Sequence, residues 1–166
     1  MFGKKKKKLD NESLKNGVGL ITFTDPTSTI AEQFRTVRTN IQFSSVDKAL
    51  KSIVFTSSAP SEGKSTVSNN VAVTWADQGK RVLIVDADMR RPTVHRTFRV
   101  SNAVGLSNLL AETGSIENAV HETVVDNLSV MPSGPIPPNP SELLGSGKMA
   151  ALLDQLTAAF DLVVID

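Results

Sequence analysis

The segment at residues 58–66 constrains the fold more than any other part of this sequence. It reads S-A-P-S-E-G-K-S-T, follows a short apolar run at residues 53–55, and precedes a segment with helical periodicity. A tight loop between a strand and a helix presents successive backbone N–H groups to a phosphate, at the positive end of the helix. We therefore predict a phosphate-binding loop, whose candidate nucleotide contacts are Ser58, Ala59, Pro60, Ser61, Glu62, Gly63, Lys64, Ser65 and Thr66.

Two residues of this loop have individual roles in such a motif. Lys64 is placed to reach the β- and γ-phosphates of a nucleotide, and the Ser65 hydroxyl is a candidate ligand for Mg²⁺. The strict pattern G-x-x-x-x-G-K-[ST] has glycine where this chain has Ser58, so the match fails at its first position. The strand–loop–helix context, rather than the bare G-K-S, carries the prediction.

A second motif ends in two carboxylates. Residues 82–85 are continuously apolar, as in a central parallel strand covered on both faces, and Asp86 and Asp88 follow. Residues two apart on an extended chain point the same way, so both carboxylates can face one Mg²⁺–phosphate cluster. The alternative is a strand that ends in a polar turn. The phosphate-binding loop one strand–helix unit upstream favours the metal and catalytic interpretation.

A third motif closes the sequence. Residues 160–166 form an apolar run that ends in Asp166, the pattern of a Walker B strand, whose acid holds Mg²⁺ in phosphate-loop enzymes. A catalytic acid at the last position has nothing beyond it to fix its strand. We therefore expect the sequence to be a fragment whose continuation is missing.

The order of the patterns predicts the fold class. Strands are expected at 52–57, 81–86, 127–131 and 161–166, and helices at 64–78, near 105–111 and 115–121, and at 147–159. Strands that alternate with helices predict an α/β fold, a doubly wound, mostly parallel sheet with helices on both faces. We expect residues 1–28 to be a flexible basic leader and residues 29–166 to be one phosphate-loop domain that ends at the Walker B strand.

A helix is predicted to begin near residue 29. Thr29 as N-cap with Glu32 three positions later would make a capping box. An apolar stripe then follows, made of Ile30, Phe34, Val37 and Ile41. On a neighbouring face Glu32, Arg35 and Arg38 recur at spacings of three, which by itself is typical of a solvated helix face with weak ion pairs.

Composition excludes several classes of protein. The 166 residues include no cysteine, which excludes disulfides and thiolate metal sites. The net charge of +1 gives no general reason to expect nucleic acid as a partner. Lys4 to Lys8 form a basic run, which is either a solvated tail or a segment attracted to an anionic membrane surface. Nucleic acid is a third possible partner, for this run alone.

Together these motifs resemble the bacterial tyrosine kinases of capsule and exopolysaccharide synthesis. The resemblance covers residues 29–166 and includes E-x-x-R-x-x-R at residues 32–38, G-L-S-N-L-L at residues 105–110, and the proline-rich stretch at residues 132–144. It implies an ATP-dependent protein-tyrosine autokinase that uses Mg²⁺ and regulates polymerisation and export of the polysaccharide. The absence of a membrane span points to the separate cytoplasmic (Firmicute) type.

The resemblance also implies roles for the acidic and basic residues. Lys64 would neutralise charge on the transferred phosphoryl group, and Ser65, Asp86 and Asp166 would hold Mg²⁺. Asp86 is the better candidate for the base that takes the tyrosine proton, with Asp88 in support, and spacing alone does not separate the two. Arg90 and Arg91 are either clamps for a phosphate or an acidic acceptor, or surface arginines; His95 and Trp75 are expected to be structural.

Partners follow from the same resemblance. Glu32 of one subunit would pair with Arg35 and Arg38 of the next to close a ring. A transmembrane chain-length-determinant protein would activate the kinase at the inner face of the plasma membrane. This location favours the anionic membrane surface as the partner of Lys4 to Lys8. The family is phosphorylated in trans on a C-terminal tyrosine cluster, whereas these 166 residues contain no tyrosine, so the cluster is expected in the missing tail.

Two rival functions stay open. One is a partitioning-type ATPase, whose loop has a signature lysine at the position of Ala59, so its absence speaks against that class. The other is a non-catalytic scaffold of polysaccharide export that binds nucleotide. The presence of Lys64, Ser65 and the three aspartates speaks against the scaffold.

Overall fold

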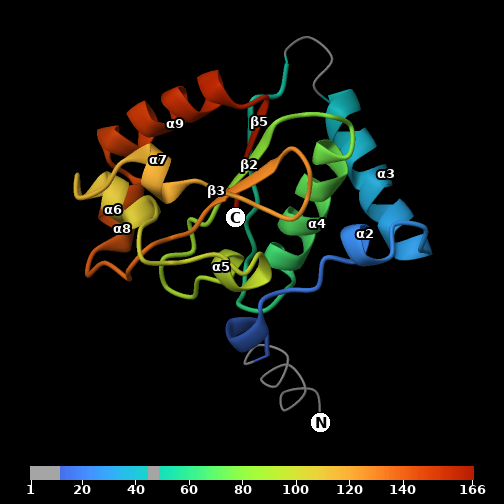
Figure 1. Cartoon of the computed structure of the whole chain (residues 1–166), viewed down its shortest axis with the longest axis horizontal. Coiled ribbons are helices and arrows are strands. Elements are labelled where there is room, and N and C mark those ends of the chain that lie inside the picture. The colour runs from blue at the N-terminus through green and yellow to red at the C-terminus, as the bar shows by residue number, and fades with distance from the viewer. Residues whose placement is uncertain (1–11, 45–48) are drawn as a thin grey trace.

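The computed structural model describes residues 12–44 and 49–166. Within them the strands form one sheet in the order β1-β5-β2-β4-β3 (Figure 1). β1, β5, β2 and β4 are parallel, and β3 is antiparallel to β4. The sheet is thus mostly parallel, as predicted. The strands are β1 (Ser52–Val54), β2 (Val82–Val85), β3 (His121–Glu122), β4 (Leu128–Met131) and β5 (Leu162–Ile165).

Helices cover both faces of this sheet (Figure 1). One face carries α2, α3, α4 and α5, and the other carries α6, α7, α8 and α9. The doubly wound arrangement is therefore confirmed. The helices are α2 (Ile21–Thr24), α3 (Thr29–Ser44), α4 (Lys64–Ala76), α5 (Val94–Thr97), α6 (Leu106–Leu110), α7 (Ile116–Ala119), α8 (Pro140–Leu144) and α9 (Gly147–Ala159).

The apolar run of β2 supplies residues to two hydrophobic cores. Val82 and Ile84 pack on the α4 side with Trp75, while Leu83 and Val85 pack on the α9 side. All four strand residues are buried, because alternate side chains of a strand point to opposite faces and both faces are covered. Trp75 is a core residue, as expected. The strand ends in the loop that carries the two aspartates.

Residues 12–28, which we expected to belong to a flexible leader, differ from that expectation. Thr22 is buried, and both its backbone N–H (3.0 Å) and its hydroxyl (2.9 Å) donate to Oδ1 of Asn70 on α4. The segment is held because a buried asparagine side chain offers the hydrogen bonds that this short helix needs. The basic run Lys4 to Lys8 lies outside the described residues.

The start of α3 is one residue earlier than predicted. The hydroxyl of Ser28 accepts a hydrogen bond from the backbone N–H of Ala31 at 3.2 Å, so Ser28 rather than Thr29 caps the helix. The predicted capping box is therefore wrong.

The buried face of α3 also differs from the predicted stripe. Phe34 and Ile41 pack against the core, and Ala31 is fully buried. Ile30 is 54% exposed and Val37 is 38% exposed. The buried side of α3 is thus rotated toward Ala31 and toward Arg38, which donates to the carbonyl of Thr74 on α4, and Ile30 and Val37 turn toward solvent.

Other elements also differ from the prediction. β1 ends at Val54 rather than at residue 57, and β3 forms at the end of the helix expected at residues 115–121. α5 and α8 form where no helix was predicted. Pro140 occupies the first turn of α8, where its missing N–H costs no helical hydrogen bond. Gly79, with φ of 78°, follows α4, and its backbone N–H donates to the carbonyl of Ala76 at 2.9 Å, so this glycine terminates the helix.

Candidate nucleotide and phosphoryl-transfer site

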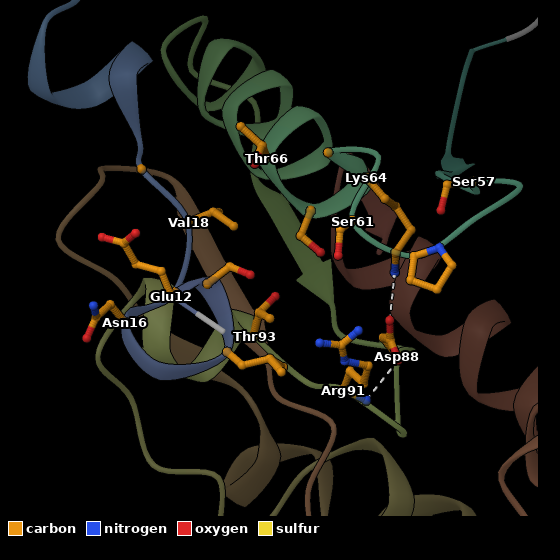
Figure 2. A pocket seen from close by; sticks show the side chains of 17 residues that line it. Glu12, Asn16, Val18, Ser57, Ser61, Lys64, Thr66, Asp88, Arg91 and Thr93 are labelled. Atoms are coloured by element: carbon orange, nitrogen blue, oxygen red, sulfur yellow. Dashed lines mark hydrogen bonds and ion pairs between the residues drawn. The ribbon is translucent and has the colours of Figure 1, made fainter. Parts of the chain in front are cut away.

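The predicted phosphate-binding loop lies between β1 and α4, at the carboxyl edge of the sheet. It borders a cavity of about 640 Å³, within the range of small-molecule sites (Figure 2). The lining residues come from the loop, from the segment after β2 and from the chain before α2. They are Glu12, Ser13, Leu14, Asn16, Gly17, Val18, Gly19, Ser57, Pro60, Ser61, Gly63, Lys64, Ser65, Thr66, Asp88, Arg91 and Thr93.

The backbone of the loop explains its departure from the glycine pattern. Positive φ occurs at Ser61 (62°) and Gly63 (97°), and not at Ser58. Nothing about the backbone therefore requires glycine at the first position. Gly63 has the left-handed conformation directly before α4, which suits glycine better than any other residue.

Glu62 closes the beginning of the loop. Its carboxylate oxygen Oε2 accepts hydrogen bonds from the backbone N–H groups of Ser58 and Ala59, each at 3.1 Å, and from the Ser58 hydroxyl at 3.1 Å. A charged acceptor on several donors makes a stronger contact than a neutral one. The serine that replaces glycine thus adds a contact that glycine could not make.

Lys64 is the point where three separate segments of the chain meet. Its ammonium lies 3.5 Å from Oδ2 of Asp88, in the segment after β2, and 3.6 Å from Oδ1 of Asp166, after β5. The side chain of Lys64 is 18% exposed, that of Asp88 is 34% exposed and that of Asp166 is fully buried. The structure thus brings together three of the residues that the sequence motifs singled out.

The surroundings of Asp166 fit a bound Mg²⁺–nucleotide. Oδ1 accepts a hydrogen bond from the Ser68 hydroxyl at 2.7 Å, whereas Oδ2 is buried and has no hydrogen-bond partner among the described residues. Ser65 lines the same cavity from the first turn of α4. Since Mg²⁺ is usually held by one or two carboxylates together with phosphates and water, this donor set is adequate. Within residues 12–44 and 49–166, no group of three or more His, Cys, Asp or Glu side chains is arranged to hold a metal ion by itself.

Asp86 is buried beside the cavity and does not line it. Oδ2 accepts from the backbone N–H groups of Thr93 and Val94, both at 3.0 Å, and Oδ1 accepts from that of Asp88 at 3.2 Å. Burial raises the pKa of Asp86 to about 7, and the nearby Asp166 adds to the rise, while the two hydrogen bonds and Lys64 oppose it. In this arrangement Asp86 holds the segment that presents Asp88.

Arg90 and Arg91, which follow Asp88, have different surroundings. Arg91 lines the cavity, and its backbone N–H donates to Oδ1 of Asp88 at 3.0 Å. Arg90 is exposed and does not line it. His95 is half-buried, and burial lowers the pKa of its imidazole, which suits a structural residue.

Sequence reasoning missed several residues of the site. Ser68 lies one helical turn after Lys64, so its spacing could have indicated that both face the same side of α4. Glu62 lies four positions from Ser58 and was assigned only a general place in the loop. The lining residues at 12–19 gave no signal, because a chain without periodicity offers none.

The three residues of the expected assembly motif differ in their surroundings. Glu32 is exposed and pairs with Arg35 at 2.9 Å, and Arg35 also donates to the carbonyl of Pro26 at 2.7 Å. Arg38 donates to the carbonyl of Thr74 on α4 at 2.7 Å, and burial lowers its pKa. Glu32 and Arg35 thus remain reachable from outside, while Arg38 is largely engaged within the chain.

Comparison with known proteins adds to this geometry. A family model described as an AAA domain matches residues 50–166. The chain is 50% identical over 147 residues to "Tyrosine-protein kinase YwqD" of Bacillus subtilis (strain 168), covering 89% of this chain and 62% of that protein. It is 46% identical over 141 residues to "Putative tyrosine-protein kinase CapB" of Staphylococcus aureus, covering 85% and 62% respectively.

A solved structure shows the same similarity. The crystal structure of the chimerical protein CapA2B2 superposes with a TM-score of 0.84 at 41% identity, and the match covers 95% of this chain and 74% of that one. The chain belongs to the bacterial tyrosine-kinase family. The resemblance drawn from its motifs is thereby confirmed. The chain spans about 62% of the length of the two curated bacterial tyrosine-kinase relatives. No helix among its described residues is long and apolar enough to cross a membrane.

Proposed function

We propose that this protein is an ATP-dependent protein-tyrosine kinase that acts in capsular or exopolysaccharide synthesis. The observation that carries the proposal is the meeting of Lys64 with Asp88 and Asp166 beside the phosphate-binding loop. A cation between two acids at such a loop suits the transfer of a phosphoryl group, where positioning and charge stabilisation supply most of the catalysis. The names of the relatives support the choice of tyrosine as acceptor.

The proposed reaction has one chemical step. The acceptor's phenolic oxygen forms a bond to the γ-phosphorus of ATP, the bond from that phosphorus to the bridging oxygen breaks, and ADP leaves with the bridging oxygen. Lys64 offsets the charge that develops on the transferred group. The phenolic proton goes to a carboxylate, and Asp88 is our candidate because its carboxylate faces the cavity.

Mg²⁺ would neutralise phosphate charge in this site. Ser65, Asp166 and Asp86 are the candidate residues to hold it. Asp86 could contribute an oxygen only by giving up part of its hydrogen bonding to Thr93, Val94 or Asp88. We therefore assign Asp86 first to positioning the segment after β2, and second to Mg²⁺.

The acceptor tyrosine lies outside these 166 residues, which contain none. We propose that it lies on protein substrates, including a C-terminal segment of the same protein in a neighbouring subunit. Subunits would meet through α3, on which Glu32, Ile30 and Val37 are exposed. The other proposed partner is a transmembrane chain-length-determinant protein at the inner face of the plasma membrane, with Lys4 to Lys8 against anionic lipid.

The proposal is tested by phosphotyrosine formation. Purified full-length protein is incubated with Mg²⁺-ATP and the cytoplasmic tail of the activator, beside Lys64→Met and the matched surface variant Lys148→Met. Lys148 pairs with Glu112 away from the loop. We expect phosphotyrosine in the wild type and Lys148→Met and none in Lys64→Met. ATP binding without any phosphotyrosine in the wild type would favour a scaffold or an ATPase.

A further inference from the structure

The chain before α2 forms one wall of the nucleotide cavity. Figure 2 shows Glu12, Asn16 and Val18 across the cavity from Lys64 and Ser61 of the phosphate-binding loop. We call residues 12–19 the leader wall. Leu14 of this segment also lines the cavity and is half-buried. A segment that precedes the first strand of the sheet by more than thirty residues thus belongs to the site.

The leader wall is fastened to α5 at a position that requires glycine. The backbone N–H of Val18 donates to the Thr97 hydroxyl at 3.0 Å, and Arg96 donates to the carbonyl of Lys15 at 3.2 Å. Gly17 lies between these contacts with φ of 79°, and a Cβ there would come within 2.4 Å of the Thr97 backbone nitrogen. Any side chain at Gly17 would therefore push the leader wall away from α5.

A second fastening joins the leader wall to the phosphate-binding helix. The side-chain amide of Asn70 donates to the carbonyl of Gly19 at 2.8 Å and to that of Thr66 at 2.9 Å. Thr66 belongs to the first turn of α4 and lines the cavity itself. The wall is thus held by two elements that carry the site.

The position of the wall indicates which substrate it meets. The segment after β2 carries Asp88 at the point of transfer, then Arg91 and Thr93 along the cavity, and continues into α5, on which the wall rests. In Figure 2 Thr93 and Arg91 lie between the wall and Asp88. The wall therefore faces the Asp88 side of the cavity, where a group that gives its proton to Asp88 must enter.

We propose that the leader wall is part of the acceptor subsite and binds the tyrosine-bearing segment of the substrate. This inference rests on the proposed function. Leu14 and Val18 offer apolar contact to a phenol ring, and the exposed Asn16 offers hydrogen bonds to an extended peptide. Arg91, which also lines the cavity, suits an acceptor with acidic neighbours, whereas the triphosphate is bound by the backbone of the loop.

The test separates acceptor binding from nucleotide binding. Full-length protein is compared with Gly17→Ala, which displaces the wall, and with Leu14→Ala, which trims its side chain and leaves the backbone contacts in place. The control is Gly147→Ala, because a Cβ at Gly147 meets nothing within 4 Å. The probe is a fluorescent glutamate–tyrosine copolymer. Its KM in the kinase reaction and its direct binding in the presence of Mg²⁺-ADP are measured, together with the Kd of a fluorescent ADP.

We expect both wall variants to raise the copolymer's KM and weaken its direct binding by about tenfold, as the removal of one good apolar contact would. The Kd for ADP should stay within about twofold, and Gly147→Ala should change neither quantity. If the binding of ADP and of the copolymer weakens equally, the leader wall belongs to the nucleotide site. If neither weakens, the leader wall has no binding role. Either result overturns the inference. If no phosphotyrosine forms even in the wild type, the proposed function fails, while the direct binding measurement still decides on the wall.

Discussion

The ammonium of Lys64 lies 3.5 Å from the carboxylate oxygen Oδ2 of Asp88, although one residue follows β1 and the other follows β2. The contact joins the phosphate-binding loop to the segment that we propose meets the acceptor. Because Asp88 lines the cavity and Asp86 does not, the geometry separates two acids that spacing alone left equivalent.

The first prediction concerns the base. Asp88→Asn keeps the size of the side chain and removes its ability to take a proton, so kcat should fall by about 10²–10⁴-fold. The Kd for ADP should change little. The measurement is steady-state phosphorylation of a tyrosine-containing copolymer beside Asp126→Asn, an exposed control. If Asp88→Asn loses less than about tenfold and Asp86→Asn loses far more, the base is Asp86.

The second prediction concerns Glu62, whose carboxylate holds the first two backbone N–H groups of the loop. Glu62→Ala should weaken ATP binding by about tenfold, because the loop must then be ordered without this charged acceptor. Glu62→Gln keeps one acceptor oxygen and should recover most of the affinity. Titration with a fluorescent ATP analogue measures both, with the exposed Glu117→Ala as control. If Glu62→Ala and the wild type bind the ATP analogue with equal affinity, Glu62 does not order the loop for nucleotide binding.

The third prediction concerns the pH dependence of stability. The pKa of Asp86 is raised to about 7 in the folded protein from the ordinary value of 3.8, so the folded state retains a proton that the unfolded state loses as the pH rises between these values. The free energy of unfolding therefore falls over this range, by about a few kcal/mol at most, and the penalty is complete above pH of about 7.

Asp86→Asn removes this titration. The free energy of unfolding of the variant, minus that of the wild type, should therefore increase as the pH rises from about 4.5 to about 8. Urea unfolding at several pH values measures the difference, and Asp126→Asn is the control. A difference between Asp86→Asn and the wild type that stays constant with pH would show that Asp86 does not titrate in this range.

The fourth prediction concerns assembly. Glu32→Ala removes an exposed carboxylate that pairs with Arg35 on the same helix, so folding should be unaffected while the assembly dissociates to monomers. Arg38→Ala should also lower Tm, by about 3 °C, because Arg38 is half-buried against the carbonyl of Thr74. Light scattering after size exclusion gives the mass, with the exposed Glu122→Ala as control. Unchanged mass in Glu32→Ala would contradict the proposed interface.

The central strands and the phosphate-binding loop could be predicted from local sequence patterns. The continuous apolar runs before Asp86 and Asp166 indicated two central strands, since only a doubly covered strand tolerates such runs. The loop at Lys64 followed from its fixed spacing to the next helix. Parallel topology then places the carboxyl ends of these strands at one edge, so the meeting of Lys64, Asp88 and Asp166 was predictable in outline.

The features that were not predicted depend on contacts between residues far apart in the sequence. The leader wall is ordered by Asn70 and Thr97, each more than fifty residues away along the chain, and no local pattern reports such partners. The apolar stripe of α3 was misassigned because the small Ala31, rather than the larger Ile30, lies on the buried side of the helix. The burial of Asp86 likewise depends on Thr93 and Val94, whose N–H groups turn back onto it.

The central claim is that the Lys64–Asp88 pair serves transfer to a tyrosine rather than hydrolysis. The most direct measurement follows γ-labelled ATP with the full-length protein and its activator, and separates label on tyrosine, label on serine or threonine, and free phosphate. We predict that label appears on tyrosine and that Lys64→Met abolishes it, while Lys148→Met does not. Label found only as free phosphate, at the same rate with and without a tyrosine acceptor, would contradict the account and indicate an ATPase.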